Sequence, residues 1–123
     1  MDDLIKALIK EHPRPGLSLL DIEPPRIESS DDVMFKVEYC ALCVGEIKVY
    51  EWGEWAAADP TIQLPTVLGH EASGVVTAIG KDVTRFKVGD RIAIDPMISC
   101  GLCHQCRAGR TNMCENREIY GKQ

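Results

Sequence analysis

Four cysteines crowd into the segment from position 100 to position 114, and they constrain the fold of this chain more than any other feature. They are Cys100, Cys103, Cys106 and Cys114. Four thiols at this spacing suit a closed tetrahedral zinc site, which would supply folding energy to a segment without an apolar core of its own. Gly101 and Gly109 would let the backbone turn tightly enough for amide N–H groups to reach the sulfur atoms. A closed site leaves the metal no open position, so we expect no chemistry there.

Two other interpretations of the four cysteines stay open, namely a disulfide pair and an iron–sulfur cluster. Cytosolic thiols stay reduced, and in that compartment a dense set of cysteines favours metal binding over disulfides. His104 could replace one thiol as a ligand. Because four cysteines already complete a tetrahedron, we expect His104 to be a solvated loop residue.

Length and charge exclude several classes of function. The 123 residues, 45% of them hydrophobic, suffice for one compact domain. The net charge of -5 and the absence of a Lys/Arg run argue against nucleic acid and anionic membranes as partners. No apolar stretch is long enough to span a membrane, and Asp2 and Asp3 stand where a signal peptide would carry positive charge. We therefore expect a cytoplasmic protein.

The rest of the chain is patterned as a mainly β protein, with Gly and Pro punctuating short apolar stretches. Val33, Phe35, Val37 and Tyr39 alternate with polar residues, which predicts a strand with one buried face. Apolar residues recur at near-helical spacing between Gly45 and Trp55, which predicts a short helix. Further strands are predicted over residues 5–9, 17–22, 74–79 and 91–94.

A second set of metal-ligating residue types arises at the ends of predicted strands. Cys43 follows the strand that begins at Val33, and Gly69-His70-Glu71 follows the segment 64–68. A thiol and an imidazole suit zinc. On spacing alone, a lone cysteine and a lone histidine are more often core residues than ligands.

Motifs along nearly the whole chain resemble those of the zinc-containing medium-chain dehydrogenase family. In order they are Cys43, the run from Gly69 to Val76, the run from Gly80 to Arg91, and the four-cysteine segment. Residues 49–55 and 109–114 are most similar to L-threonine 3-dehydrogenases and to polyol dehydrogenases. The resemblance implies a GroES-like, partly open β-barrel with short helices and a zinc-binding loop lobe. It also implies a Rossmann domain elsewhere in the full-length parent.

The resemblance further implies a role for each matching residue. Cys43 and His70 match ligands of a catalytic zinc, and Glu71 matches the carboxylate that binds or approaches it. With the structural zinc held by the four cysteines, two zinc ions per chain are expected. A zinc with an open position would bind a secondary alcohol or polyol, lower the pKa of its hydroxyl and stabilise the alkoxide from which hydride passes to NAD or NADP. The resemblance also implies a full-length parent that is a homodimer or homotetramer.

Several positions depart from the family pattern. Gly45 stands where a relay Ser or Thr is usual, and Lys48 stands where threonine dehydrogenases have a relay His. Glu46 replaces an Asp, and we weigh a role in orienting His70 against an exposed helix carboxylate. Lys48 is either a solvated lysine or an acceptor of the substrate proton. Trp52 and Trp55 either line a substrate mouth or simply pack.

The sequence also bears on domain organisation. No Gly-x-Gly-x-x-Gly follows a strand, so residues 1–123 are expected to form an incomplete GroES-like catalytic domain. The Rossmann domain and a barrel-completing C-terminal segment would be absent, and the isolated chain would be inactive. The alternative is a non-catalytic GroES-like module for assembly or interaction. A zinc ribbon that joins Cys40 and Cys43 to Cys100 and Cys103 would leave Cys106 and Cys114 idle.

Overall fold

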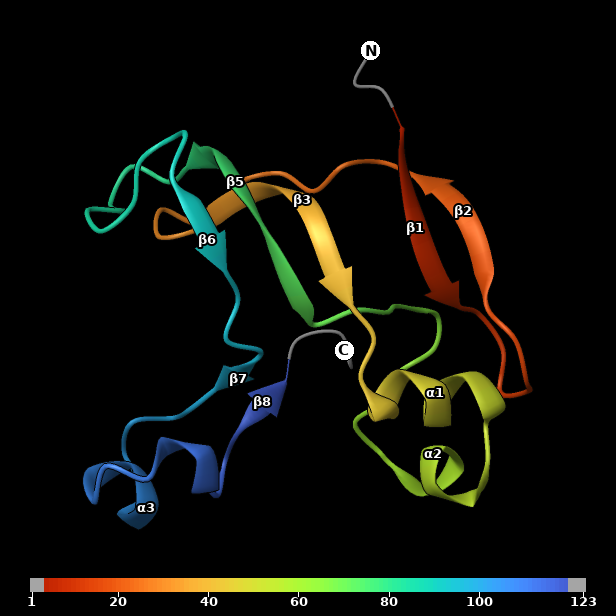
Figure 1. The fold of residues 1–123 in the computed structure, drawn as a ribbon. Helices are drawn as coiled ribbons and strands as arrows, with labels where there is room; N and C mark the ends of the chain where they lie inside the picture. The colour runs from red at the N-terminus through yellow and green to blue at the C-terminus, as the bar shows by residue number, and fades with distance from the viewer. Residues whose placement is uncertain (1–3, 120–123) are drawn as a thin grey trace.

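The computed structural model describes residues 4–119 as a mainly β structure with three short α-helices (Figure 1). Two three-stranded sheets lie in its upper part, and the helices gather at its lower end (Figure 1). The prediction of a mainly β fold is confirmed. Asp2 and Asp3, and the last four residues of the predicted domain, lie outside the described residues.

The first sheet has the strand order β2-β1-β4. Strands β1 (Ile5–Lys10) and β2 (Ser18–Ile22) pair antiparallel from Ile5↔Ile22 to Ile9↔Ser18, as the two apolar stretches predict. Strand β4 (Thr66–Val67) pairs with the other edge of β1. At two residues, β4 is too short to give a periodic signal, so the sequence does not predict it.

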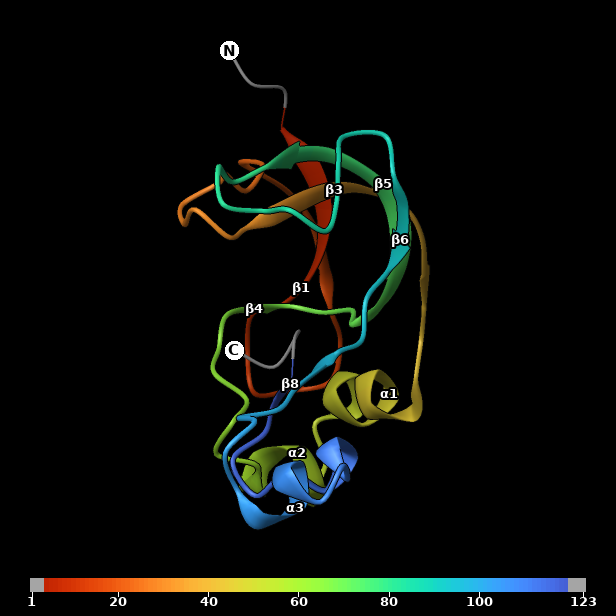
Figure 2. The same ribbon diagram turned by 90° about the vertical axis from the view of Figure 1, so that its left-hand side faces the viewer.

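The second sheet has the strand order β3-β5-β6. Strand β3 (Val33–Ala41) pairs antiparallel with β5 (Glu71–Ile79), which pairs in turn with β6 (Arg91–Ala93). The strands predicted in these regions are confirmed. Figure 2 shows the strong curvature of β5 and β6.

The predicted buried face of β3 is wrong for its second half, since Val37 is 52% and Tyr39 is 74% exposed. The register shifts between Met34 and Phe35 and again between Val37 and Tyr39. At the second shift the extra residue, Glu38, belongs to β3, so Tyr39 no longer shares the face of Val37. Val33, Phe35 and Val37 line an open hollow of about 930 Å³ together with apolar residues in and beside β6, among them Phe86, Ile92 and Ile94.

The predicted helix between Gly45 and Trp55 is two helices, α1 (Val44–Glu51) and α2 (Glu54–Ala58). Helix α1 ends at Trp52, whose φ of 50° lies in the left-handed region. Gly53 then starts the second helix. The apolar spacing indicated helix but could not reveal the break, because a left-handed tryptophan has no sequence signature.

The cysteine-rich segment forms a lobe, which we define as residues 97–119. A two-stranded ribbon of β7 (Met97–Ile98) and β8 (Glu118–Ile119) joins it to the sheets. Between them lie α3 (His104–Arg107) and a 3-10 turn (Thr111–Met113). The lobe projects from the lower end of the molecule, on the side opposite α1 and α2 in Figure 1.

The apolar core is small and centres on the inner faces of β1 and β5, where Ala7, Ile9, Ala72 and Val76 are buried. Among residues 4–119, no helix combines the length and the apolar character needed to cross a bilayer.

We expect the Val76→Ala variant to lower the free energy of unfolding by about 2 kcal/mol. Val76 is 1% exposed, and removing its two methyl groups leaves a cavity beside strand β5. Urea unfolding would measure the change. Val88→Ala is the matched control, since Val88 is 61% exposed and should cost less than about 0.5 kcal/mol. Equal losses in the two variants would contradict this location of the core.

Candidate metal sites

Two groups of potential metal ligands form among the described residues, with the ligand atoms of each group within 4.8 Å of one another. One contains Cys43, Glu46 and His70, and the other contains the four lobe cysteines. The four lobe cysteines are the predicted structural zinc site. For the other site the predicted ligands are Cys43, His70 and Glu71, whereas the structure brings Glu46 together with Cys43 and His70. Their geometry decides which atoms remain free for a metal.

In the first group, the end of β3 and the start of β5 bring Cys43 and His70 together. The β3–β5 ladder reaches its last pair at Ala41↔Glu71, so the two residues lie just beyond it. The Cys43 Sγ lies 3.3 Å from the His70 Nε2. Two ligands on a tetrahedral zinc would be about 3.5 Å apart for ordinary Zn–S and Zn–N bonds. The pair therefore fits a zinc ion without rearrangement.

Glu46 supports both of these residues from the first turn of α1. Its Oε2 accepts a hydrogen bond from the Cys43 backbone N–H at 2.9 Å, and the Cys43 Sγ accepts one from the Gly45 N–H, a capping arrangement at the helix start. The other Glu46 oxygen, Oε1, lies 2.6 Å from the His70 Nδ1. With Nδ1 engaged by a carboxylate, the Nε2 lone pair of His70 is left free for a metal.

Burial of the carboxylate and the thiol shapes the electrostatics of this group. Glu46 is only 5% exposed, so it is not the exposed helix carboxylate that was the alternative for this position. Burial raises the pKa of the Cys43 thiol, and the adjacent Glu46 carboxylate acts in the same direction. A cation at this position would relieve both effects, because it favours the thiolate and compensates the buried carboxylate.

Other residues highlighted by the sequence lie outside this group. Glu71 is exposed at the start of β5. Its carboxylate oxygens do not lie within 4.8 Å of both the Cys43 sulfur and a His70 ring nitrogen. Cys40 is exposed, and its sulfur packs against Gly69. The Lys48 ammonium lies over the Trp55 ring at 5.0 Å.

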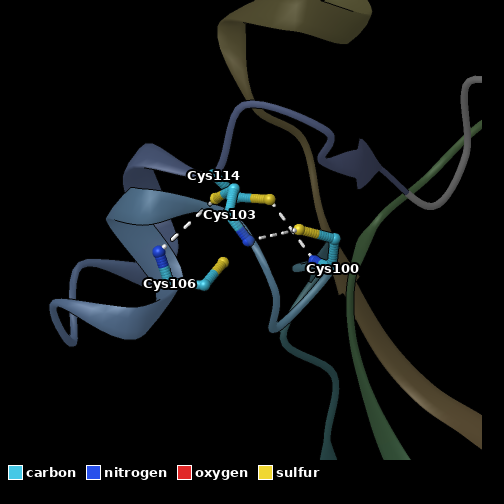
Figure 3. A group of neighbouring side chains, drawn as sticks. All are labelled: Cys100, Cys103, Cys106 and Cys114. Carbon is cyan, nitrogen blue, oxygen red and sulfur yellow. Dashed lines mark hydrogen bonds between the residues drawn. The ribbon is translucent and has the colours of Figure 1, made fainter.

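The second group lies inside the lobe, where Cys100, Cys103, Cys106 and Cys114 converge (Figure 3). Backbone N–H groups point at the sulfur atoms: Cys100 donates to the Cys114 Sγ at 3.3 Å, and Cys103 donates to the Cys100 Sγ at 3.4 Å. The Cys106 N–H donates to the Cys103 Sγ at 3.5 Å, which caps α3. Gly101 and Gly109 adopt φ of 70° and 76°, which permits these turns.

The chemistry of the four thiols fits a divalent cation. Backbone hydrogen bonds from Leu102 and Cys103 lower the pKa of Cys100 to about 6. Desolvation and the neighbouring sulfur atoms raise the pKa of Cys106 to about 12. The four cannot all ionise at neutral pH without a cation to balance them, and zinc does this for four thiolates. His104 is exposed at the start of α3 and is not part of the group, as predicted.

Two contacts near these groups were not identified from the sequence. The Asn116 Nδ2 lies 4.0 Å from the Cys100 Sγ, and the Arg117 Nη1 donates to the Cys114 carbonyl at 3.4 Å. Both residues follow Cys114 in a polar stretch, where nothing in the sequence separates them from other surface side chains.

We expect the Glu46→Gln variant to bind zinc at the Cys43–His70 pair about 10- to 100-fold more weakly, because the amide loses the charge that supports His70. Competition with a chromophoric chelator would measure both sites in one titration. Glu51→Gln is the matched control, since Glu51 is exposed on the same helix. A loss at the lobe equal to that at the pair would contradict this role of Glu46.

Comparison with known proteins places these groups in context. Residues 29–122 match the family described as "Alcohol dehydrogenase GroES-like domain". The L-threonine 3-dehydrogenase of Vibrio parahaemolyticus is 39% identical over 112 residues, which cover 91% of this chain and 32% of that protein. The chain thus spans about a third of the length of the curated relatives it matches.

Solved structures are similar over the same region. The alcohol dehydrogenase of Aeropyrum pernix superposes with a TM-score of 0.79 at 29% identity, covering 96% of this chain and 34% of that one. An alcohol dehydrogenase of Escherichia coli CFT073, complexed with NADH, superposes with a TM-score of 0.76 at 31% identity, covering 97% and 32%. The predicted GroES-like, partly open fold is confirmed by these similarities.

Proposed function

Because the chain belongs to the alcohol dehydrogenase GroES-like domain family, we propose that it is the zinc-bearing catalytic domain of an NAD(P)-dependent dehydrogenase of secondary alcohols or polyols. The observation that carries this proposal is the Cys43–His70 pair, whose ligand atoms lie 3.3 Å apart and are oriented by a buried carboxylate. A module used only for assembly would have no need to keep such a pair preorganised.

In this proposal, each site residue has a distinct task. Cys43 and His70 hold the catalytic zinc, and Glu71 is an additional carboxylate at the same edge of β5. Lewis-acid activation of a substrate hydroxyl is what zinc supplies in such a site, and hydride acceptance is what a nicotinamide supplies. Glu46 engages Nδ1 of His70, so that Nε2, beside the Cys43 Sγ, is left to bind the metal. The four lobe cysteines hold a second zinc of structural character.

The proposal extends to the full-length protein. The nicotinamide would be bound by a separate Rossmann domain, and a further segment would complete the barrel, so residues 1–123 alone would be inactive. The relatives named L-threonine 3-dehydrogenase support a small hydroxyl-bearing substrate. Free thiols at all six cysteines suit a cytoplasmic location, where thiolate ligands stay reduced. The full-length assembly would be a homodimer or homotetramer.

The first test is zinc per chain in the reduced protein, with Cys43→Ser beside it. We expect two zinc ions to fall to one. Cys40→Ser is the matched control, since its thiol is exposed three positions earlier and belongs to neither ligand group. One zinc in all three proteins would contradict the catalytic site and leave only the lobe filled.

Activity is tested in a chimera in which this chain replaces the matched 112 residues of the Vibrio parahaemolyticus enzyme. We expect reduction of NAD or NADP with a secondary alcohol, a polyol or L-threonine, and its loss in Cys43→Ser. The zinc content and circular dichroism of each chimera establish that it is folded and loaded. A folded, loaded chimera without activity on any of these substrates would favour the non-catalytic module instead.

A further inference from the structure

A buried lysine lies at the end of strand β1, away from both ligand groups. Lys10 is 0% exposed, and its ammonium donates to the carbonyl oxygens of Arg14 at 2.5 Å, Gly16 at 3.0 Å and Tyr50 at 3.1 Å. It also lies 5.2 Å from the centre of the Trp52 ring. Burying a charge is costly unless its hydrogen-bonding capacity is met, and here three carbonyls and an aromatic face meet it.

These contacts join two elements that are distant in sequence. Tyr50 is in the last turn of α1, and Trp52 ends that helix, so the ammonium lies at the negative end of the helix dipole. The Gly16 N–H donates to the same Tyr50 carbonyl at 3.0 Å. Lys10 and the turn after it thus attach the far end of α1 to strand β1.

Strand β1 also supports the segment that carries His70. Lys10 is the register partner of Thr66 in β4, and the Leu68 N–H donates to the Leu8 carbonyl at 2.9 Å. His70 follows two residues later. Cys43 and Glu46 lie at the N-terminal end of α1. The β3–β5 ladder has its last pair at Ala41, so it cannot fix the direction of the helix that follows.

We propose that Lys10 is a positioning residue for the Cys43–His70 metal site, in which it anchors α1 to β1 and so holds the Glu46 carboxylate against His70. This inference rests on the metal site proposed above. Lys10 acts through the helix and not on the metal, because its ammonium is occupied by main-chain carbonyls at the opposite end of α1.

The test is a cobalt(II) titration of the native chain and of Lys10→Met, which keeps an unbranched side chain one atom shorter and removes its charge. Thiolate-to-cobalt and ligand-field absorption bands distinguish a four-thiolate site from one with a single thiolate. We expect affinity at the Cys43–His70 pair to fall about tenfold, the lower end of the range for lost supporting contacts, with altered ligand-field bands. The lobe is the internal reference, because a general loss of stability in Lys10→Met would change cobalt affinity at both sites to the same extent.

Lys6→Met is the matched control on the same strand, since Lys6 pairs with Asp21 on the surface. It should leave both sites unchanged. Unchanged affinity and spectrum at the pair in a folded Lys10→Met chain would overturn this inference alone. A native chain that loads cobalt only in the lobe would overturn the proposed catalytic site, and this inference with it.

If Lys10→Met does not fold, native-state hydrogen exchange decides the question. By thermodynamic reciprocity, occupancy of the pair must strengthen the contacts that position it. We expect the Gly16 and Trp52 amides, whose acceptors are the Tyr50 and Lys48 carbonyls, to exchange more slowly in the zinc-loaded native chain than in zinc-loaded Cys43→Ser. Equal rates would overturn the proposal.

Discussion

The Cys114→Ser substitution is expected to unfold the lobe and to remove one zinc ion per chain, while both three-stranded sheets stay folded. Cys114 is 0% exposed and is the one buried residue of the lobe, whose Leu102 and Met113 are 76% and 57% exposed. The segment therefore lacks an apolar core. A structural zinc contributes on the order of 10 kcal/mol to the folding of such a segment, and serine is a poor substitute ligand.

Limited proteolysis and zinc analysis would measure this result together. We expect rapid cleavage between residues 97 and 119 in Cys114→Ser, with a zinc count reduced by one. In Leu102→Ala, which removes an exposed apolar side chain from the same lobe, both should be unchanged. A lobe that stays resistant to proteolysis after chelation would contradict the metal's role in holding it.

A Gly74→Ala substitution is expected to destabilise the second sheet by at least about 3 kcal/mol, near the upper end for overpacked sites. A Cβ at position 74 would lie 1.9 Å from the Lys36 carbonyl oxygen and 2.8 Å from the Lys36 carbonyl carbon. Both atoms belong to the neighbouring strand β3, so the clash can be relieved only by separating the two backbones. Since Cys43 and His70 lie at the end of that ladder, metal binding at the pair should weaken as well.

Urea unfolding and zinc affinity would be measured on the same preparation. Gly53→Ala is the matched control, because a Cβ there meets no atom within 4 Å and its φ of −76° is ordinary for any residue. We expect this control to change stability by less than about 1 kcal/mol. Equal effects at the two glycines would show that the close approach at Gly74 is not the cause.

The sequence predicted best where the signal is local. Alternation and turn residues identified strands β1, β2, β3, β5 and β6, and the spacing of four thiols identified the lobe cluster. Each of these patterns depends on residues that are near one another in the chain. The bulge at Glu38 of β3 and the left-handed conformation of Trp52 depend on tertiary contacts, which no local pattern in the sequence reveals.

The Cys43–His70 pair shows the limit of spacing as evidence. The residues are 27 positions apart, and only the resemblance to a known family suggested that they meet. The sequence allows Glu46 either to orient His70 or to be an exposed helix carboxylate. Its burial beside His70 cannot be predicted, because polar and apolar residues are mixed around this helix. Lys10 gave no signal, because a lysine at the end of a strand is ordinarily solvated.

The contrast between the two ligand groups has a consequence for the order of assembly. All four lobe ligands come from residues 100–114, and their own backbone amides turn toward the sulfur atoms, so closing this loop requires no other part of the chain. The Cys43–His70 pair requires the β3–β5 ladder and the attachment of α1 to β1. Contacts between distant segments form more slowly than local ones. During refolding, the lobe should therefore capture its metal before the Cys43–His70 pair has formed.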